Sequence, residues 1–340
     1  MKKLSLILLA ISLAVTSAQP ARAADAVADF YKGKTVTIYI GLAAGGLYST
    51  FGQILARHMG KHIPGQPNVI VQHQPGAGGL IASNAVYNTL PKDGTVLHTP
   101  NGGMTRRIVL GEPQARLDPR KWNWLGGWSE PINDCTVWSK SPATTLEQAK
   151  DKEDIIGAVD TGSATYTTPA LINYFLGTKF KIVPGYGGGS QVRLAMERSE
   201  VHGFCGQFEG WKSVKPEWLA AGRLSHLVQL ASKRSPDMPN TPLLSEFARN
   251  DEEKAIFEFI QSSLEDRSMV MAPEVPKDRV DAMRKAYMDT LRDKEFLAEA
   301  NAQQFEINIV EPGEIVAYVE KAYTLKPEAI AKIRKAQGLD

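Results

Sequence analysis

The sequence has little of several features that would place it in a large class of proteins. Among 340 residues there are only two cysteines, and 39 Lys and Arg nearly balance 37 Asp and Glu. So few cysteines exclude a disulfide-rich miniprotein. The balanced charge argues against a nucleic-acid partner, which needs a concentrated basic face to neutralise phosphates. After residue 20 no apolar run approaches the roughly 18 to 20 residues of a membrane-spanning helix.

Residues 1–23 follow a different pattern from the rest of the chain. They begin with two lysines, continue with an apolar stretch at residues 4–15, and end in Ala-Arg-Ala at residues 21–23, which places small residues where signal peptidase reads them. This pattern predicts a cleavable secretion signal and a mature chain that begins at Ala24. An N-terminal anchor that stays attached is the alternative. Cleavage leaves 36 basic and 37 acidic side chains, a net charge of −1.

Export gives the two cysteines a possible structural role. Outside the cytosol, Cys135 and Cys205 are an even number with one possible pairing, which predicts a disulfide. The bond would close a loop of about 70 residues, for which the loss of chain entropy on unfolding is worth about 4 kcal/mol. Two buried free thiols are the alternative. A metal site has less support, because His202 is the only other candidate ligand close to Cys205 in sequence.

The rest of the chain repeats a strand rich in β-branched and aromatic residues, a glycine-rich turn, and a stretch with apolar residues at helical spacing. This order is typical of βαβ units and of a mainly parallel sheet covered by helices. The length favours two such domains. We predict domain 1 at residues 24–128 and 236–340, the second part being helical, and domain 2 at residues 129–235. The predicted strands are 35–40, 69–71, 95–99, 135–138, 154–159, 181–183, 201–205, 224–230 and 306–310, and the predicted helices are 50–61, 80–90, 166–176, 191–198, 277–292, 294–302, 313–323 and 327–337.

Four glycine-rich turns follow predicted strands, at residues 41–46, 74–79, 160–165 and 185–189. In open α/β sheets the carboxyl ends of the strands meet the N-termini of the following helices at one edge, where backbone N–H groups and helix dipoles favour anions. Two turns come from each half of the chain, which predicts that two lobes each present a pair to one cleft. A carboxylate fits better than a triphosphate, because the sequence has neither a G-x-x-x-x-G-K-[ST] motif nor a G-x-G-x-x-G motif after the first strand.

The turns lie within longer sequence blocks: residues 33–57, Q-P-G-A-G-G at 74–79, P-K-D-G-T at 91–95, and residues 180–189 followed by L-A-M-E at 194–197. In order and spacing these blocks resemble the Bug family, the periplasmic receptor proteins of tripartite tricarboxylate transporters. The resemblance implies a two-lobed α/β binding protein of type II topology, with each lobe a mainly parallel sheet flanked by helices, the chain crossing between lobes twice, and a ligand cleft between the lobes. It also implies a periplasmic monomer without cofactor that delivers a small carboxylate to one large and one small integral membrane subunit.

The functional positions of that family carry over by motif. The two turns of domain 1 would hold one ligand carboxylate through backbone N–H groups and waters, and the loops of domain 2 would complete the cleft. The resemblance thus implies ligand contacts from Ala44, Gly45, Gly46, Tyr48, Ser49, Pro75, Gly76, Ala77, Gly78, Gly162, Ser163, Ala164, Thr165, Tyr186 and Gly187. Family members usually have an Asp where this chain has Ser49. We therefore expect a less acidic pocket wall, which favours an aromatic or purely acidic ligand over one with an ammonium group.

Some side chains near the turns have two possible roles. Tyr48 and Tyr186 lie inside glycine-rich turns rather than on apolar periodic faces, which favours ligand contact over packing. Gln207 follows a predicted strand, and its amide is a further candidate for the cleft. Arg106 and Arg107 follow another glycine turn, and either is a candidate counter-charge for a ligand carboxylate or an ordinary surface residue.

Catalysis and metal binding have less support in the sequence. Ser163 lacks the G-x-S-x-G surroundings of a nucleophile and is expected to be a hydroxyl donor. Asp160 is the only acid within the four turns, and it makes no convincing general base. His58 and His62 have the spacing of zinc ligands but not the Glu that H-E-x-x-H requires, so we expect a solvated helix face and no metal. We expect a binding protein, with an exported α/β enzyme or a sensory receptor for a carboxylate as the alternatives.

Overall fold

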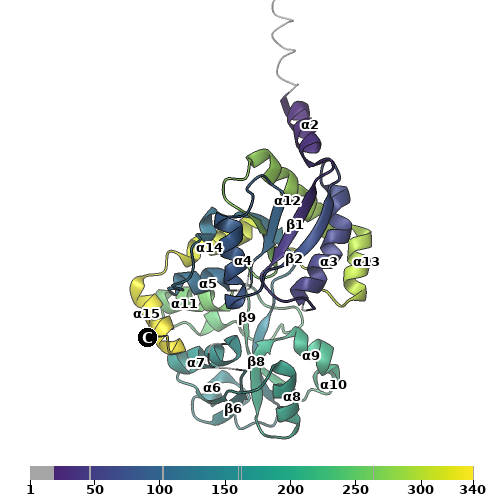
Figure 1. The fold of residues 1–340 in the computed structure, drawn as a ribbon. Coiled ribbons are helices and arrows are strands. Elements are labelled where there is room, and N and C mark those ends of the chain that lie inside the picture. The colour runs from purple at the N-terminus through teal and green to yellow at the C-terminus, as the bar shows by residue number, and fades with distance from the viewer. Residues whose placement is uncertain are drawn as a thin grey trace, which may run out of the picture. The chain divides into compact units, whose positions relative to one another are not determined.

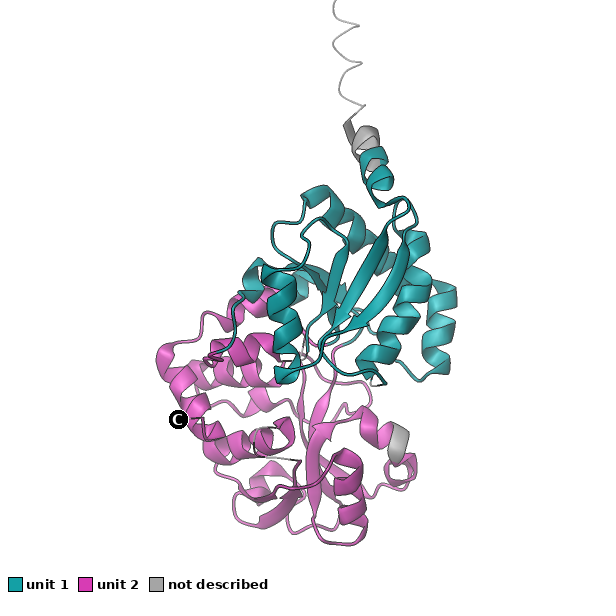
Figure 2. Cartoon of the chain, viewed as in Figure 1, with its two compact units in different colours: residues 1–101, 114–129, 267–315 teal, residues 102–113, 130–266, 316–340 magenta. Residues whose placement is uncertain are grey.

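A computed structural model describes residues 19–45, 47–101, 103–159, 161, 163–262 and 264–339. Residues 1–18 of the expected secretion signal lie outside the described residues, so the signal stays a prediction. The chain divides into two compact units (Figure 2). Unit 1 comprises residues 1–101, 114–129 and 267–315, and unit 2 comprises residues 102–113, 130–266 and 316–340. Among the described residues, no helix is both long enough and apolar enough to cross a membrane.

Unit 1 is built on a five-stranded sheet (Figure 1) with the strand order β2-β1-β3-β10-β4. Strand β1 pairs in parallel with β2 and β3, whereas β10 is antiparallel to both β3 and β4. Four of the five strands therefore run in the same direction, as expected of a mainly parallel sheet. The strands are β1 (Thr35–Ile40), β2 (Asn68–His73), β3 (Val96–Thr99), β4 (Asn123–Gly127) and β10 (Ser268–Met271).

The core of unit 1 forms where helices cover the alternate apolar residues of this sheet. Val36, Ile38 and Ile40 of β1 are buried, with at most 1% of each exposed, because residues two apart lie on the same face of a strand. Phe51 and Trp128 stack within this core, with ring centroids 3.8 Å apart. Figure 1 shows α3 and α13 side by side, and they are in contact. The helices are α2 (Gln19–Tyr31), α3 (Leu47–Met59), α4 (Leu80–Asn88), α12 (Lys277–Arg292), α13 (Lys294–Ala302) and α14 (Pro312–Ala322), the last of which continues into unit 2.

Unit 2 has a second five-stranded sheet, in the order β7-β6-β8-β5-β9. Strand β6 is parallel to β7 and β8, and β5 is antiparallel to β8 and β9. The position of the antiparallel strand is thus the same in both units. The strands are β5 (Asn133–Trp138), β6 (Glu153–Gly157), β7 (Lys179–Val183), β8 (Gly203–Gln207) and β9 (Leu224–Leu230).

Each face of the second sheet has its own apolar core. Phe204 and Cys205 are successive residues of β8, so their side chains point to opposite faces, and they belong to different clusters of buried residues. The cluster around Phe204 includes Trp211 and Trp218, whereas the cluster around Cys205 includes residues of α7, α11 and α15. The helices are α5 (Met104–Val109), α6 (Leu146–Ala149), α7 (Ala164–Leu176), α8 (Gly189–Glu197), α9 (Glu209–Val214), α10 (Pro216–Ala220), α11 (Asp251–Gln261) and α15 (Pro327–Gln337).

The division into units differs from the expected one. We expected residues 236–340 to join domain 1 and the chain to cross between lobes twice, but residues 236–266 and 316–340 belong to unit 2 and the chain changes unit five times. The reason is packing: Phe257 of α11 and Ile333 of α15 are 1% and 0% exposed in the core of unit 2. A helical pattern in the sequence shows that a helix has an apolar face but not which sheet that face covers.

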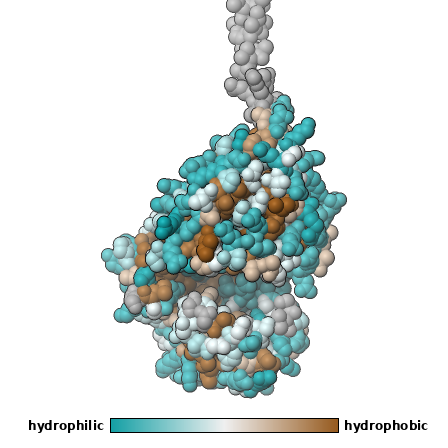
Figure 3. All heavy atoms as spheres, viewed as in Figure 1, coloured by the Kyte–Doolittle hydropathy of each residue, from teal (hydrophilic) through white to brown (hydrophobic). Residues whose placement is uncertain are grey.

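The predicted strand at residues 306–310 is wrong, and α5, α9 and α11 were not among the predicted helices. In the structure Val310 forms a single bridge to Gly127 at the edge of unit 1's sheet, and the N–H of Asn308 donates to the carbonyl of Trp128 over 2.9 Å, but no strand forms. Strands β4 and β10 were not predicted, since N-W-L-G-G and S-M-V-M lack a strand pattern of useful length. On the face shown in Figure 3, residues are mostly hydrophilic, and apolar residues form small patches among them.

Candidate functional site

Two glycine-rich turns of unit 1 follow β1 and β2, as predicted. The second turn has positive φ at Gly76, Gly78 and Gly79, which glycine adopts without a steric penalty. The two turns touch through their backbones: a Cβ on Gly41 would lie 2.6 Å from Cα of Gly79. Only glycine at position 41 allows this approach, so the conformations of the two turns depend on each other.

Side chains from the neighbouring strands hold the two turns in place. Asn101, which follows β3, donates its Nδ2–H to the carbonyl of Gly78 over 3.0 Å. Ser49 is 1% exposed, and its hydroxyl lies 3.2 Å from Nε2 of His73, whose Nδ1 is 2.9 Å from the carbonyl oxygen of Leu42. We expected the Ser49 side chain in the pocket wall, but the structure buries it in this tether between the first turn and the end of β2.

His98 supports the second turn from within unit 1. Burial lowers the pKa of His98 to about 4, so its imidazole is neutral at physiological pH, and a backbone hydrogen bond to Tyr39 only partly offsets this effect. The ring Nδ1 lies 2.9 Å from the carbonyl of Tyr39, and Nε2 lies 2.9 Å from the hydroxyl of Ser83. In the neutral ring Nδ1–H donates and Nε2 accepts, which links β1, β3 and the start of α4.

The remaining predicted residues of unit 1 mostly face solvent. Gly46 lies outside the described residues. Tyr48 is half-buried and packs edge-on against Trp128, with ring centroids 5.7 Å apart. Its ring therefore has a packing role, which the sequence could not separate from ligand contact. Exposed positions are Ala44, Gly45, Pro75, Ala77 and Gly78, and Gly76 is partly buried.

A pocket of about 410 Å³ lies within unit 2, where β8 ends and α7 and α8 begin. This is the edge of the sheet at which the sequence predicted a site, and three predicted residues line it: Ala164, Thr165 and Gln207. Residues that the sequence did not indicate also line it, including Asn133 and Asp134 at the start of β5, Thr168 of α7, and Ser190 and Arg193 of α8.

Arg193 is the functional candidate that sequence reasoning missed. It is 5% exposed, and its guanidinium lies over the rings of Phe204 and Trp211, at 5.3 and 4.7 Å from their centroids. Two glycines make room for it, because a Cβ on Gly189 or Gly210 would lie 3.1 or 1.9 Å from its terminal nitrogens. Burial lowers the pKa of Arg193, and the negative charge of Asp134 partly offsets this. The signal in the sequence was a charge three residues before Met196, which is buried and lies on the same face of α8.

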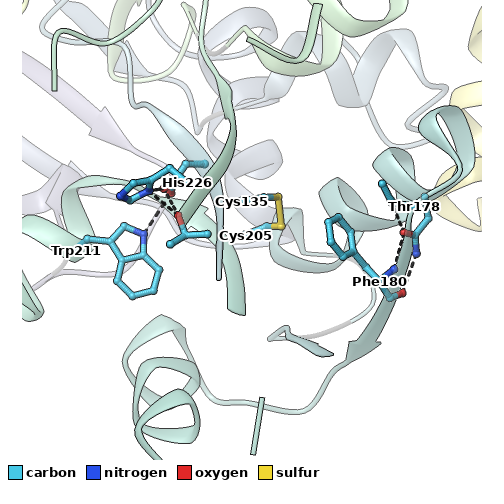
Figure 4. The surroundings of a disulfide bond; sticks show 9 residues. Cys135, Thr178, Phe180, Cys205, Trp211 and His226 are labelled. Carbon is cyan, nitrogen blue, oxygen red and sulfur yellow. Dashed lines mark hydrogen bonds and ion pairs between the residues drawn. A yellow bond between two sulfur atoms is a disulfide. The ribbon is translucent and has the colours of Figure 1, made fainter. Parts of the chain in front are cut away.

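Asp134 is the one acid among the residues that line this pocket, and its own hydrogen bonds occupy both carboxylate oxygens. Oδ1 accepts from the indole N–H of Trp211 over 3.3 Å, and Oδ2 lies 2.6 Å from Nδ1 of His226 and accepts a short hydrogen bond from Thr136. Figure 4 shows His226 and Trp211 joined through this carboxylate. Asp134 is 0% exposed.

The other predicted residues of unit 2 lie away from this pocket or within local hydrogen bonds. Gly162 lies outside the described residues. The hydroxyl of Ser163 is 2.7 Å from that of Thr165, and the N–H of Gly187 donates to the side chain of Gln191 over 2.7 Å. Tyr186 is partly buried against the apolar cluster of Phe204 and is absent from the described lining of the pocket. The turn that carries Tyr186 folds back onto the core, so the packing alternative describes its position.

The two arginines considered as counter-charges are engaged elsewhere in unit 2. Arg106 donates to the carbonyl of Ile260 over 2.6 Å, and Arg107 pairs with Glu112 over 2.7 Å. Neither lines the pocket near Arg193. Their position after a glycine turn resembled that of a ligand-binding residue. In the structure Arg106 reaches an acceptor from a distant segment of the same unit, and Arg107 reaches one five residues away.

The disulfide between Cys135 and Cys205 is present, as predicted. The two residues are directly opposite each other on the antiparallel strands β5 and β8, with a Cα–Cα distance of 4.0 Å, and both are buried (Figure 4). Cys205 also lines the pocket of unit 2. The bond therefore ties together two strands whose ends bear residues of the candidate site.

The histidines with zinc-ligand spacing belong to an ion-pair network in unit 1. His58 lies 2.7 Å from Glu299 and its side chain is only 14% exposed, so the expected solvated face is wrong for this residue. His58, Asp293 and Glu295 are close enough to share an ion, but Lys61 reaches Asp293 at 3.1 Å and Glu295 at 2.6 Å. Backbone donation from Phe296 and the charge of Lys61 lower the pKa of Asp293 to about 2. A lysine thus already supplies positive charge to these carboxylates.

A larger cavity of about 700 Å³ lies between α11, α14 and α15 of unit 2. Four of the charges that line it form two ion pairs, Lys321 with Glu258 at 2.6 Å and Lys332 with Glu252 at 2.8 Å. It is far in sequence from every predicted turn, and no buried charge of the kind seen at Arg193 lines it among the described residues. The smaller pocket at the strand ends is therefore the better candidate site.

Comparison with known proteins supports the resemblance seen in the sequence. The chain matches no protein-family model. It is 26% identical over 319 residues to a curated protein of Cupriavidus necator, the UPF0065 protein in the gbd 5′ region, with 88% of each chain covered. Among solved structures it is similar to a TctC solute-binding protein from Polaromonas without ligand, with a TM-score of 0.71, 18% identity, and coverage of 90% of this chain and 99% of that one.

A second solved structure shares the fold and holds a ligand. MatC from Rhodopseudomonas palustris with bound malate matches with a TM-score of 0.56 and 18% identity, over 89% of this chain and 99% of that one. At such identities the likeness concerns the fold. The expected fold class, a two-lobed α/β periplasmic binding protein with type II strand order, is confirmed by these matches and by the two sheets.

Proposed function

We propose that the chain is a periplasmic substrate-binding protein that captures a small organic acid between its two units. It then delivers the acid to a tripartite tricarboxylate-type transporter with one large and one small integral membrane subunit. The turns of unit 1 around Gly45 and Gly78 would hold the ligand from one side, and the pocket of unit 2 from the other. Closure around the ligand is a population shift driven by contacts made only in the closed state, and it needs no chemical step.

One observation carries the proposal: α7 and α8 both begin at the pocket of unit 2. Ala164 and Thr165 are the first residues of α7, and Gly189 and Ser190 are the first of α8, and all four line the pocket. The N-terminus of a helix presents backbone N–H groups and a partial positive charge, which favour an anion. The similarity to MatC, whose structure holds malate, supports the same chemical class of ligand.

A thermal-shift screen of the purified protein tests the proposal. The panel contains mono-, di- and tricarboxylates, aromatic acids, amino acids and sugars. A ligand that binds only the folded state stabilises it by RT ln(1 + [L]/Kd), so a micromolar binder at millimolar concentration adds about 4 kcal/mol. A shift confined to organic acids, with the acid recovered unchanged, is the expected result. No shift with any acid would refute the proposal, and consumption of one would favour the enzyme alternative.

The transport step has its own test. Deleting the gene should abolish uptake of the acid found in the screen, and restoring it should recover uptake. A strain that takes up the acid equally well without the gene would contradict delivery to a transporter. The alternative function, a sensory receptor that binds the same acid, would then be favoured.

A further inference from the structure

The pocket of unit 2 holds a positive charge with which no described residue pairs. Only 5% of Arg193 is exposed, yet none of the described residues offers its guanidinium a hydrogen bond or an ion pair. Its Nε is one of the buried polar atoms without a partner. Arg267, which is also buried, donates to the hydroxyl of Ser129 over 3.0 Å. An unpaired buried charge is unfavourable, so Arg193 lowers the stability of the free protein unless something else compensates it.

The surroundings of Arg193 hold its guanidinium in one orientation. The rings of Phe204 and Trp211 lie against it at 5.3 and 4.7 Å, and the two glycines 189 and 210 allow its terminal nitrogens to approach the backbone. Aromatic rings stabilise the charge through cation–π interaction but accept no strong hydrogen bonds. The N–H groups of the guanidinium therefore remain available in a pocket of about 410 Å³.

Asp134 does not neutralise Arg193 by direct contact. Its oxygens bond to Trp211, His226 and Thr136, and no ion pair joins it to Arg193. The negative charge of Asp134 raises the pKa of Arg193. Asp134 therefore partly offsets the positive charge of Arg193 without accepting a hydrogen bond from its guanidinium. The other side chains at the pocket, such as Thr165, Ser190 and Gln207, are uncharged.

We propose that Arg193 binds a carboxylate of the ligand directly, which makes this pocket a carboxylate subsite built within unit 2. A guanidinium presents two parallel N–H donors that match the two oxygens of a carboxylate. This inference rests on the proposed function and narrows it: the ligand must place a carboxylate in unit 2 itself, held by a side-chain charge as well as by helix N-termini. Neutral sugars and amines are excluded by the same argument.

Three variants test the subsite, using the acid that gives the largest thermal shift in the wild-type protein. Arg193→Met removes the charge but keeps a long side chain, and Arg193→Lys keeps the charge but loses the paired donors. Arg198→Met is the matched control, because Arg198 follows the same helix and its side chain is 63% exposed. By titration calorimetry we expect Kd to rise at least 100-fold in Arg193→Met and about 10-fold in Arg193→Lys, and to stay within twofold in Arg198→Met.

The melting temperature without ligand separates a binding role from a packing role. Because no described residue pairs with the charge of Arg193, Arg193→Met should melt at the wild-type temperature or above it. A melting temperature several degrees below wild type, with wild-type affinity in Arg193→Lys, would assign Arg193 to packing and overturn the subsite. If Arg193→Met does not fold, Arg193→Lys decides: an unchanged Kd overturns the proposal and a rise supports it.

The outcomes distinguish this inference from the proposed function. If an acid binds the wild-type protein and Arg193→Met binds it equally well, the subsite is wrong and the proposed function stands. If no acid of the panel binds the wild-type protein, the proposed function fails, and acetate and inorganic phosphate at 50 mM become the probes. Thermal protection of the wild-type protein that disappears in Arg193→Met would then support an anion subsite, and an equal response of both proteins would overturn it.

Discussion

Glu265 is a buried carboxyl group whose ionisation should oppose the folding of unit 2. It is 1% exposed, and its oxygens accept hydrogen bonds from the backbone N–H of Thr105, at 2.9 and 3.1 Å, and from the Thr105 hydroxyl. Burial raises the pKa of Glu265 from 4.5 to about 7, an effect that Asp266 reinforces and that Thr105 and Arg106 oppose. The group is therefore protonated in the native protein at a pH where an unfolded chain has released the proton.

The sign of the effect follows from the proton count. Between pH 4.5 and 7 the native state binds the Glu265 proton and the unfolded state does not, so the free energy of unfolding falls as the pH rises through this window. Each unit of pKa is worth about 1.4 kcal/mol, which gives a loss of about 3 kcal/mol in total. Glu265→Gln removes the titration and keeps an oxygen that can accept from Thr105. Relative to wild type, we expect this variant to gain about 3 kcal/mol between pH 4.5 and 7.5.

Urea unfolding of both proteins at the two pH values measures this gain. Other groups, including His98 with its pKa lowered to about 4, titrate in both proteins and cancel in the difference. At pH 4.5 the protonated Glu265 and a glutamine are close in shape and charge, so this pH is an internal control for any damage caused by the substitution. A difference in unfolding free energy between the two proteins that does not change with pH would refute the reasoning.

Three further predictions concern the disulfide, the turns and the packing of α2. Replacing Cys135 and Cys205 by Ala opens a loop of sequence separation 70 and should lower the free energy of unfolding by about 4 kcal/mol; denatured wild-type protein without reductant should contain no titratable thiol, and two would contradict the bond. Gly78→Asp should abolish the thermal shift with acids, because it adds a negative charge and a side chain where φ is 61°; unchanged affinity would remove this turn from the site. Gly65→Ala would place a Cβ 2.2 Å from the carbonyl oxygen of Ala28 in α2, at a φ of 83°. It should lower the free energy of unfolding in urea by about 2 kcal/mol without changing affinity. An unchanged free energy of unfolding would mean that α2 shifts without cost.

The sequence predicted elements well where apolar periodicity was strong. The expected bounds of β1 and α12 agree with the structure residue for residue, because alternation in one and helical spacing in the other are maintained over the whole element. Strand β10 has four residues and no such pattern. It forms because it pairs with β3 on one side and β4 on the other. Its formation depends on contacts more than a hundred residues apart, which no local pattern encodes.

The candidate site was predicted in place but not in its chemistry. The glycine turns indicated the edge of the sheet in unit 2 at which the pocket lies, since helix N-termini follow strand ends there. Arg193 was missed because its significance depends on what surrounds it: Gly210, seventeen positions later, makes room for it, and nearby acceptors are bonded to other donors. Tyr48 and Tyr186 both pack against apolar neighbours, and their contact with the ligand stays a prediction, since a glycine-rich turn does not specify whether a side chain points outward or packs inward.

The position of β10 has a consequence for the order in which the chain can fold as it emerges from its N-terminus onward. All five strands of unit 2 lie between residues 133 and 230, so its sheet can be completed before residues 268–271 emerge. Unit 1 begins first, but its sheet cannot be completed until β10 takes its place between β3 and β4. During that interval its sheet has unpaired edges, the kind of surface at which nascent chains pair with one another. Unit 1 begins first and is thus the last unit to complete its sheet. A chain that ends before residue 268 would keep the edges of β3 and β4 unpaired.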